Sequence, residues 1–179
     1  KSLYDKLLMI RNHGMIFGYD SKILGLNLRM TEISAAIAVV QLKRLPGFIK
    51  KRRANAKYFD KLLVKHVHDG HKIVHATELE WEKRNYSLYT LVVNSEIREI
   101  LIHDLYEAGY GASVYYPKPV HLLPLYRDKN IKLPFTEMAS KMVFSIPMHP
   151  GVKKKDLFSM IKIIKDTCRL EKWNKNVKL

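Results

Sequence analysis

Two polar side chains that suit anion binding, Asn27 and Arg29, stand directly before a strongly apolar segment. The amide of Asn27 offers two N–H donors that suit a phosphate oxygen, or it serves as a turn residue that bonds its own backbone. The guanidinium of Arg29 can bind an anion through two hydrogen bonds, or it can pair with Glu32 at the surface. Proteins commonly place binding groups in loops held by a rigid element, so this loop is a candidate binding loop.

The element that must hold this loop is a predicted buried helix from Thr31 to Leu45. Thr31 can cap the helix by accepting a hydrogen bond from a backbone N–H one turn further on. Glu32 then lies in the first turn, where the helix dipole favours an acid. From Ile33 to Val40 the only non-apolar side chain is the hydroxyl of Ser34, and a helix that is apolar on nearly every side is typical of a protein interior.

Helices are also predicted on both sides of this one. Residues 2–11 carry an apolar face and end at Asn12-His13-Gly14, where Gly14 suits a left-handed C-terminal position. Pro46 fits the first turn of a second long helix, because a missing N–H is tolerated there. The inward positions of that helix recur at helical spacing: Ile49, Arg52, Ala56, Phe59 and Leu63.

After a change of composition near residues 66–70, strands and helices alternate along the chain, which predicts an α/β arrangement. The predicted strands are residues 72–75, 86–93, 112–116 and 142–146. The predicted helices are residues 95–108, residues 135–141 and a last helix. The expected inward side chains are Ile97, Ile100, Leu101, Leu105 and Ala108 in the first of these helices, and Leu157, Ile161, Ile164 and Cys168 in the last.

Composition narrows the classes of protein to consider. The chain has 179 residues, of which 47% are hydrophobic, so a real core is expected. The net charge of +15 suits nucleic acid, an acidic membrane or anionic substrates, but the basic residues are spread out without interleaved aromatics, which favours a solvated surface. The single cysteine excludes an internal disulfide, and the histidines lack metal-ligand spacing. Without a membrane span or signal peptide, we expect a cytoplasmic protein.

A set of motifs in order along residues 3–168 resembles the DegT/DnrJ/StrS family of pyridoxal-phosphate-dependent sugar aminotransferases. The motifs are Asn12-His13-Gly14, the run Gly25-Leu26-Asn27-Leu28-Arg29-Met30-Thr31-Glu32, Gln41-Leu42-Lys43-Arg44-Leu45, Tyr86-Ser87-Leu88-Tyr89, Val114-Tyr115-Tyr116-Pro117, Pro119-Val120-His121 and Ser145-Ile146-Pro147-Met148-His149-Pro150-Gly151. The resemblance implies a fold type I architecture, of which this chain is the C-terminal part. Residues 1–69 would end the large domain and form linking helices, residues 70–170 the small α/β domain with a mainly antiparallel sheet, and residues 171–179 a frayed tail.

The resemblance also implies roles for single residues. Asn27 stands where the family contacts the phosphate of pyridoxal phosphate across a homodimer interface, and Arg29 belongs to the same cofactor loop. Tyr116, His121 and Tyr126 stand where the family lines its nucleotide-sugar pocket, although they also suit a proline-bounded loop with partly buried aromatics. No catalytic residue is expected in this chain, because the family places the Schiff-base lysine upstream of its His-Gly motif.

Two departures from the family pattern bear on these roles. Tyr115 replaces a histidine, and this weakens the transfer of a histidine's substrate role. Lys153-Lys154-Lys155 opens the last helix where acids are usual, so local destabilisation or anion binding is expected there.

Two functions follow from this sequence. The first is the C-terminal fragment of an aminotransferase that passes an amine from an amino acid such as glutamate to a keto-sugar nucleotide. Such a fragment would be inactive alone, because it lacks the lysine. The second is a non-catalytic regulatory or nucleic-acid-binding module of the DegT type, although nucleic acid is the less favoured partner.

Overall fold

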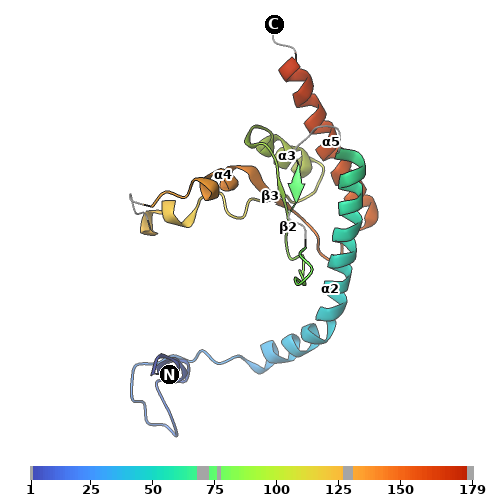
Figure 1. The fold of residues 1–179 in the computed structure, drawn as a ribbon. Helices are drawn as coiled ribbons and strands as arrows, with labels where there is room; N and C mark the ends of the chain where they lie inside the picture. The colour runs from blue at the N-terminus through green and yellow to red at the C-terminus, as the bar shows by residue number, and fades with distance from the viewer. Residues whose placement is uncertain (1, 68–72, 76–77, 127–130, 177–179) are drawn as a thin grey trace. The chain divides into compact units, whose positions relative to one another are not determined.

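The computed structural model describes residues 2–67, 73–75, 78–126 and 131–176, and it divides into two compact units at Pro46/Gly47. Helix α2 (Glu32–Val67) belongs to both (Figure 1). No helix in the described part of the chain is long and apolar enough to span a membrane.

The first unit contains helix α1 (Ser2–Arg11), a connecting loop and the first half of α2. The predicted end of α1 is confirmed: the backbone N–H of Gly14 donates to the carbonyl of Met9 at 2.8 Å, and Gly14 is left-handed with φ +75°. The predicted cap of α2 is confirmed as well, because Thr31 Oγ1 accepts a hydrogen bond from the backbone N–H of Ser34 at 3.2 Å.

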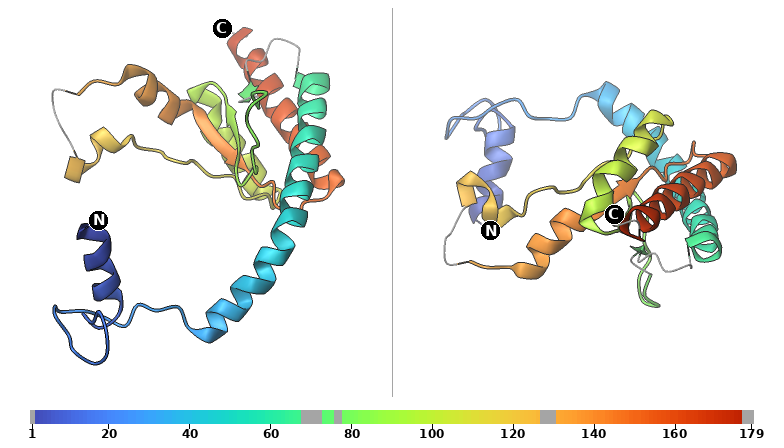
Figure 2. Two further views of the ribbon diagram at one scale, coloured as in Figure 1. Left: turned by 60° about the horizontal axis from the view of Figure 1, so that its bottom comes forward. Right: turned by 90° about the horizontal axis from the view of Figure 1, so that it is seen from above.

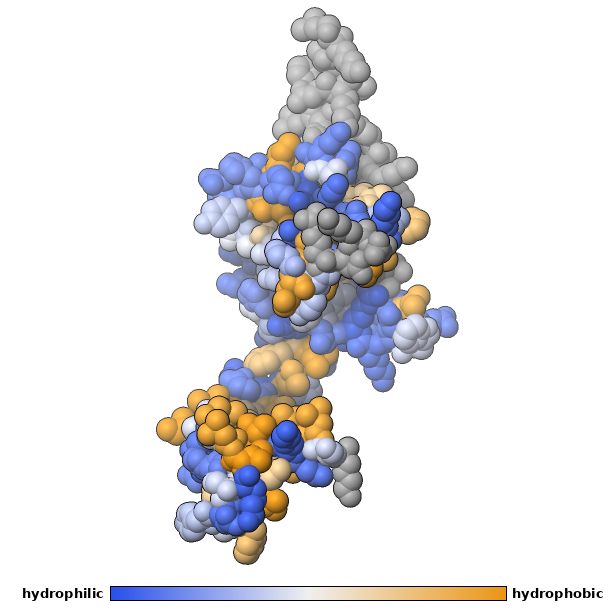
Figure 3. Space-filling view, turned by 90° about the vertical axis from the view of Figure 1, so that its left-hand side faces the viewer, coloured by the Kyte–Doolittle hydropathy of each residue, from blue (hydrophilic) through white to orange (hydrophobic). Residues whose placement is uncertain are grey.

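Two expectations for α2 are wrong. The predicted helices on either side of Pro46 are one continuous helix. The fixed φ of proline suits a helix, although Pro46 cannot donate to the carbonyl four residues earlier and its ring crowds that carbonyl. The predicted buried surface is exposed in this chain: Ile33 is 76%, Ile37 58% and Leu42 64% exposed. Within the first unit no layer of the described residues covers these side chains, and Figure 3 shows apolar side chains gathered on the surface of this unit, in the lower part of the picture.

The second unit is built on a small antiparallel sheet with the order β1 (Val74–His75), β2 (Tyr89–Val92) and β3 (Val143–Ile146). This confirms the predicted small, mainly antiparallel sheet. The predicted strand 112–116 is wrong, because that segment makes a single bridge between Ser113 and Ser145. Pro117 and Pro119 follow it and lack the N–H that would extend the ladder.

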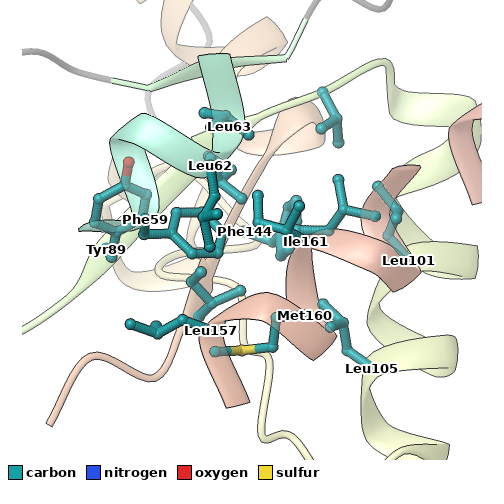
Figure 4. Packing of buried hydrophobic residues seen from close by; sticks show 14 of the residues in the cluster. Phe59, Leu62, Leu63, Tyr89, Leu101, Leu105, Phe144, Leu157, Met160 and Ile161 are labelled. Carbon is teal, nitrogen blue, oxygen red and sulfur yellow. The ribbon is translucent and has the colours of Figure 1, made fainter. Parts of the chain in front are cut away.

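Helices and turns complete the second unit, whose core is shown in Figure 4. They are α3 (Ser95–Glu107), the 3₁₀ turns η1 (Val120–Leu122) and η2 (Pro124–Tyr126), α4 (Pro134–Met142) and α5 (Lys154–Asn176). Helix α3 packs against α5, and the second half of α2 lies beside α5 in all views (Figures 1 and 2). The fold class is therefore α+β, with long helices around one small sheet.

The predicted core positions are largely confirmed. All four expected positions of α5 are buried, as are Ile97, Leu101 and Leu105 of α3. Ile100 and Ala108 are exposed instead. Ile100 lies on the side of α3 that turns away from the core, and Ala108 is the C-cap that follows the last helical residue. Helix α5 continues to Asn176, into the segment where a frayed tail was predicted. The predicted domain boundary at residues 66–70 lies mostly outside the described residues.

Replacing Leu101 by Ala should lower the free energy of unfolding by about 2–5 kcal/mol, because Leu101 is 0% exposed and its loss leaves a cavity. The matched control is Ile100→Ala, the adjacent residue at 47% exposure, with an expected loss below about 1 kcal/mol. Urea unfolding followed by circular dichroism measures both. Equal losses would contradict the core assignment.

Candidate functional site

The candidate cofactor loop is fixed to the end of α1 by backbone hydrogen bonds. The N–H of Leu26 donates to the carbonyl of Ile10 at 2.7 Å, and the N–H of Leu28 donates to that of Arg11 at 3.0 Å. These carbonyls belong to the last turn of α1, where intrahelical donors run out. The loop thus satisfies the helix end, and Asn27 is held between two anchored neighbours.

Two glycines let the chain pass this close to itself. A Cβ on Gly14 would lie 1.7 Å from the carbonyl oxygen of Ile23, and one on Gly25 would lie 2.0 Å from the nitrogen of Gly14. Both contacts are to backbone atoms, so no side-chain movement relieves them. A larger residue at either position would displace the loop that carries Asn27.

The amide of Asn27 is oriented by its neighbour. Arg29 Nε–H donates to Asn27 Oδ1 at 3.2 Å, so the Nδ2 group keeps both of its N–H donors for another partner. Both side chains are exposed. In the described part of the chain, Asn27 makes no side-chain bond to its own backbone and Arg29 makes no ion pair with Glu32. The arrangement suits an anion such as phosphate.

A cleft of about 580 Å³ opens beside Arg29 within the first unit. Its lining residues are Asp5, Leu8, Met9, Arg11, Asn12, Met15, Ile16 and Arg29. Two guanidinium groups and the carboxylate of Asp5 therefore border an apolar wall. The wall suits a flat ring, and the excess of positive charge suits an anionic group on that ring. Sequence reasoning missed Arg11 for this cleft. The only signal for it was that the Asn12-His13-Gly14 motif follows directly.

In the second unit, His121 is buried and Glu137 holds its ring. Nε2 of His121 lies 3.1 Å from Oε1 of Glu137, which also accepts the N–H of Leu133 at 3.3 Å. Both hydrogen bonds lower the pKa of the Glu137 carboxyl, and the bond to His121 has the larger effect. The contact ties η1 to α4. Glu137 was not predicted, because the spacing of 16 residues gives no sequence signal.

The two tyrosines predicted for the substrate pocket are exposed, Tyr116 at 77% and Tyr126 at 59%. The ring of Tyr116 meets that of Tyr115 edge-on, with centroids 6.0 Å apart. Among the described residues, no hydrogen bond or ring contact joins Tyr116, His121 and Tyr126 to one another. The same part of the chain contains no group of three or more His, Cys, Asp or Glu side chains placed to hold a metal ion.

A sequence model of the DegT/DnrJ/EryC1/StrS aminotransferase family matches residues 1–165. The chain belongs to this family. Among its relatives, the pleiotropic regulatory protein of Geobacillus stearothermophilus is 34% identical over 85% of this chain and 41% of its own length. The UDP-4-amino-4,6-dideoxy-N-acetyl-beta-L-altrosamine transaminase of Campylobacter jejuni (strain NCTC 11168) is 29% identical over 93% of this chain and 44% of its own length.

A solved structure agrees with the fold of this DegT-family chain. The aminotransferase TlmJ from Streptoalloteichus hindustanus superposes with a TM-score of 0.83 at 23% identity, over 96% of this chain and 46% of the other. At this identity the likeness shows the fold. The chain spans less than half the length of these relatives.

The Glu137 contact predicts a pH-dependent stability. Its lowered pKa means that the native state favours the carboxylate, so this stabilisation is present above the ordinary pKa of 4.5 and is lost as the pH falls through the native value. Glu137→Gln should therefore be less stable than wild type at pH 7, and the difference should shrink below pH 4.5. Thermal unfolding between pH 7 and 3 measures this.

The control for that series is Glu107→Gln, at the exposed end of α3, since Glu107 has no ion pair among the described residues. Its difference from wild type should stay small at every pH. A Glu137 variant that behaves in the same way would contradict the contact.

Proposed function

We propose that the whole protein is a pyridoxal-phosphate-dependent aminotransferase that acts on a keto-sugar nucleotide, and that this chain supplies the C-terminal part. The match of the family model along residues 1–165 carries the proposal. The Campylobacter transaminase, whose name specifies a UDP-linked amino sugar, supports the substrate class. An amino acid such as glutamate would donate the amine, in a cytoplasmic homodimer. The Schiff-base lysine is expected outside these residues, so the chain alone should not transaminate.

The first unit suits the cofactor. Asn27 would donate from Nδ2 to the phosphate, and Arg29 would both orient that amide and supply positive charge. The apolar wall of the adjoining cleft suits a flat ring. Pyridoxal phosphate, when bound, supplies an electron sink for the carbon that carries the amine.

The second unit suits a positioning role for His121 rather than direct contact with substrate. Its Nε2 is already paired with Glu137, and its side chain is buried. The η1 turn that carries it lies between Tyr116 and Tyr126 in sequence. We propose that His121 and Glu137 fix this segment, while the exposed tyrosines stack on the nucleotide-sugar or donate hydrogen bonds to it.

A second function, regulation through nucleic-acid binding, has two observations in its favour. The Geobacillus relative is named a regulatory protein, and the net charge is +15. Binding of this kind should weaken steeply with salt, because it depends on contacts to phosphate groups.

For the aminotransferase, Asn27→Ala in the whole protein should weaken pyridoxal phosphate binding roughly tenfold, the usual effect of one lost hydrogen bond to a charged group. Asn27→Asp is the sharper variant, because it keeps the shape and the bond from Arg29 but replaces the donors with a negative charge. It should weaken binding at least as much. Titration by cofactor absorbance measures both, and unchanged affinity in the Asp variant would contradict the phosphate role.

For the regulatory alternative, fluorescence anisotropy with labelled duplex DNA at several salt concentrations provides the test. A steep loss of affinity with salt would support DNA binding. No binding at low salt would remove this alternative and leave the enzyme proposal untouched.

A further inference from the structure

A second cleft, of about 420 Å³, lies in the second unit and takes no part in the roles described above. Its lining residues are His75, Lys83, Arg84, Asn85, Tyr86, Leu88, Tyr89 and Thr90. They come from strands β1 and β2 and from the segment that leads into β2. The volume lies within the range of small-molecule sites, about 300–1,000 Å³.

Aromatic rings form one side of this cleft. The rings of Tyr86 and Tyr89 are stacked, with centroids 6.2 Å apart and an interplanar angle of 22°. The ring of His75 lies 5.9 Å from that of Tyr89. The exposed side chain of Leu88 adds apolar surface. Such a side suits a ring-shaped ligand.

Tyr86 has an unfavourable backbone conformation that contacts from α2 stabilise. Its φ of +49° is left-handed, which is unfavourable for an aromatic residue. Arg52 of α2 stabilises it by donating from Nη1 to the carbonyls of Tyr86 at 3.0 Å and Ser87 at 3.2 Å. These bonds hold the backbone of Tyr86. Its ring is held by stacking on Tyr89 and by its hydroxyl, which lies 3.5 Å from Oε2 of Glu78, and a pre-organised ring loses little entropy on binding.

Among the charged side chains that line the cleft, Lys83 is the one without an ion-pair partner in the described part of the chain. Three acids contact residues of this cleft, and all three have partners. Glu78 takes two bonds from Arg53, at 2.7 and 3.0 Å, and Glu82 takes one from Arg84 at 2.9 Å. Asp60 accepts the hydroxyl of Tyr89, and its Oδ1 lies 3.6 Å from Nε2 of His75. Lys83 is exposed and makes no ion pair with any residue that the structure describes. Its ammonium group is thus available to an anion.

Asn85 adds neutral donors next to Lys83. Its Oδ1 accepts the backbone N–H of Ser87 at 2.9 Å, which leaves the two N–H groups of Nδ2 for a ligand. The ammonium group of Lys83 and the amide donors of Asn85, two lining residues of the same cleft, match the oxygens of a phosphate or a carboxylate.

We propose that this cleft is a binding site for a small ring compound that carries a phosphate or carboxylate group. The ring packs against Tyr86 and Leu88, and the anionic group is bound by Lys83 and Asn85. The cleft shares no residue with the proposed cofactor and substrate sites, so it is an additional ligand site whatever reaction the whole protein performs.

The test is a two-dimensional ¹H–¹⁵N NMR titration of the 179-residue chain with phenyl phosphate, benzoate, phenol and inorganic phosphate. Phenyl phosphate or benzoate should give saturable shifts centred on residues 83–90, and the tighter of the two identifies the anionic group. Phenol lacks the charge and inorganic phosphate lacks the ring, so each should bind at least fivefold more weakly, which corresponds to roughly 1 kcal/mol.

Two variants separate the site from the general basic surface. Lys83→Gln should weaken the preferred probe roughly fivefold, as expected for an exposed charge contact. Lys57→Gln, an exposed lysine of α2 outside the cleft, should leave affinity unchanged. Tyr86→Asn removes the ring while asparagine tolerates the left-handed backbone, so it should abolish the preference for ring compounds over inorganic phosphate.

Three results would overturn the proposal. The first is shifts that do not saturate or that lie away from residues 83–90. The second is an equal loss of affinity in the Lys57 and Lys83 variants, or none in the Lys83 variant. The third is inorganic phosphate binding as tightly as phenyl phosphate. None of these results bears on cofactor binding by Asn27, so failure here is distinct from failure of the proposed function.

Discussion

The second unit depends on the register between β2 and β3. This pairing sets Leu91 opposite Phe144 and Tyr89 opposite Ile146, so that all four side chains share the face that packs on the helices. Because side chains alternate across a strand, a slip of one residue would turn that face outward and bury Thr90 in its place. Side chains of α3, α5 and the second half of α2 pack with this face in one apolar cluster (Figure 4).

Helix α2 contributes more than apolar packing to this unit. Its neighbouring arginines, Arg52 and Arg53, reach the segment before β2 through bonds to the carbonyls of Tyr86, Ser87 and Arg84. These are long-range contacts, formed by a helix that also presents Phe59 to the ring of Tyr89 at 5.1 Å. The helix therefore fixes both the core side of β2 and the irregular segment that leads into it, which is why the cleft there is already formed.

The sequence predicted features that depend on local chemistry. Thr31 and Gly14 were placed correctly because a cap and a left-handed turn depend on adjacent residues. The buried side of α5 was predicted correctly from the helical spacing of its apolar residues. The strand prediction for residues 112–116 was wrong, because strand pairing depends on a partner segment that is distant in the sequence. The roles of Glu137 and Arg11 were missed for the same reason. Glu137 contacts His121, and Arg11 lines the same cleft as Arg29, only after the chain has folded.

The junction between α1 and the loop at Asn27 has a consequence for how this protein can change over evolution. Three backbone hydrogen bonds join residues 10–13 to residues 26–28, and Gly14 and Gly25 have no space for a side chain. Inserting or deleting one residue in either segment would misalign every bond of that junction. The intervening stretch around Gly18 and Tyr19 is exposed, and a Cβ on Gly18 would meet nothing within 4 Å. Changes in chain length should accumulate there, leaving the position of Asn27 undisturbed.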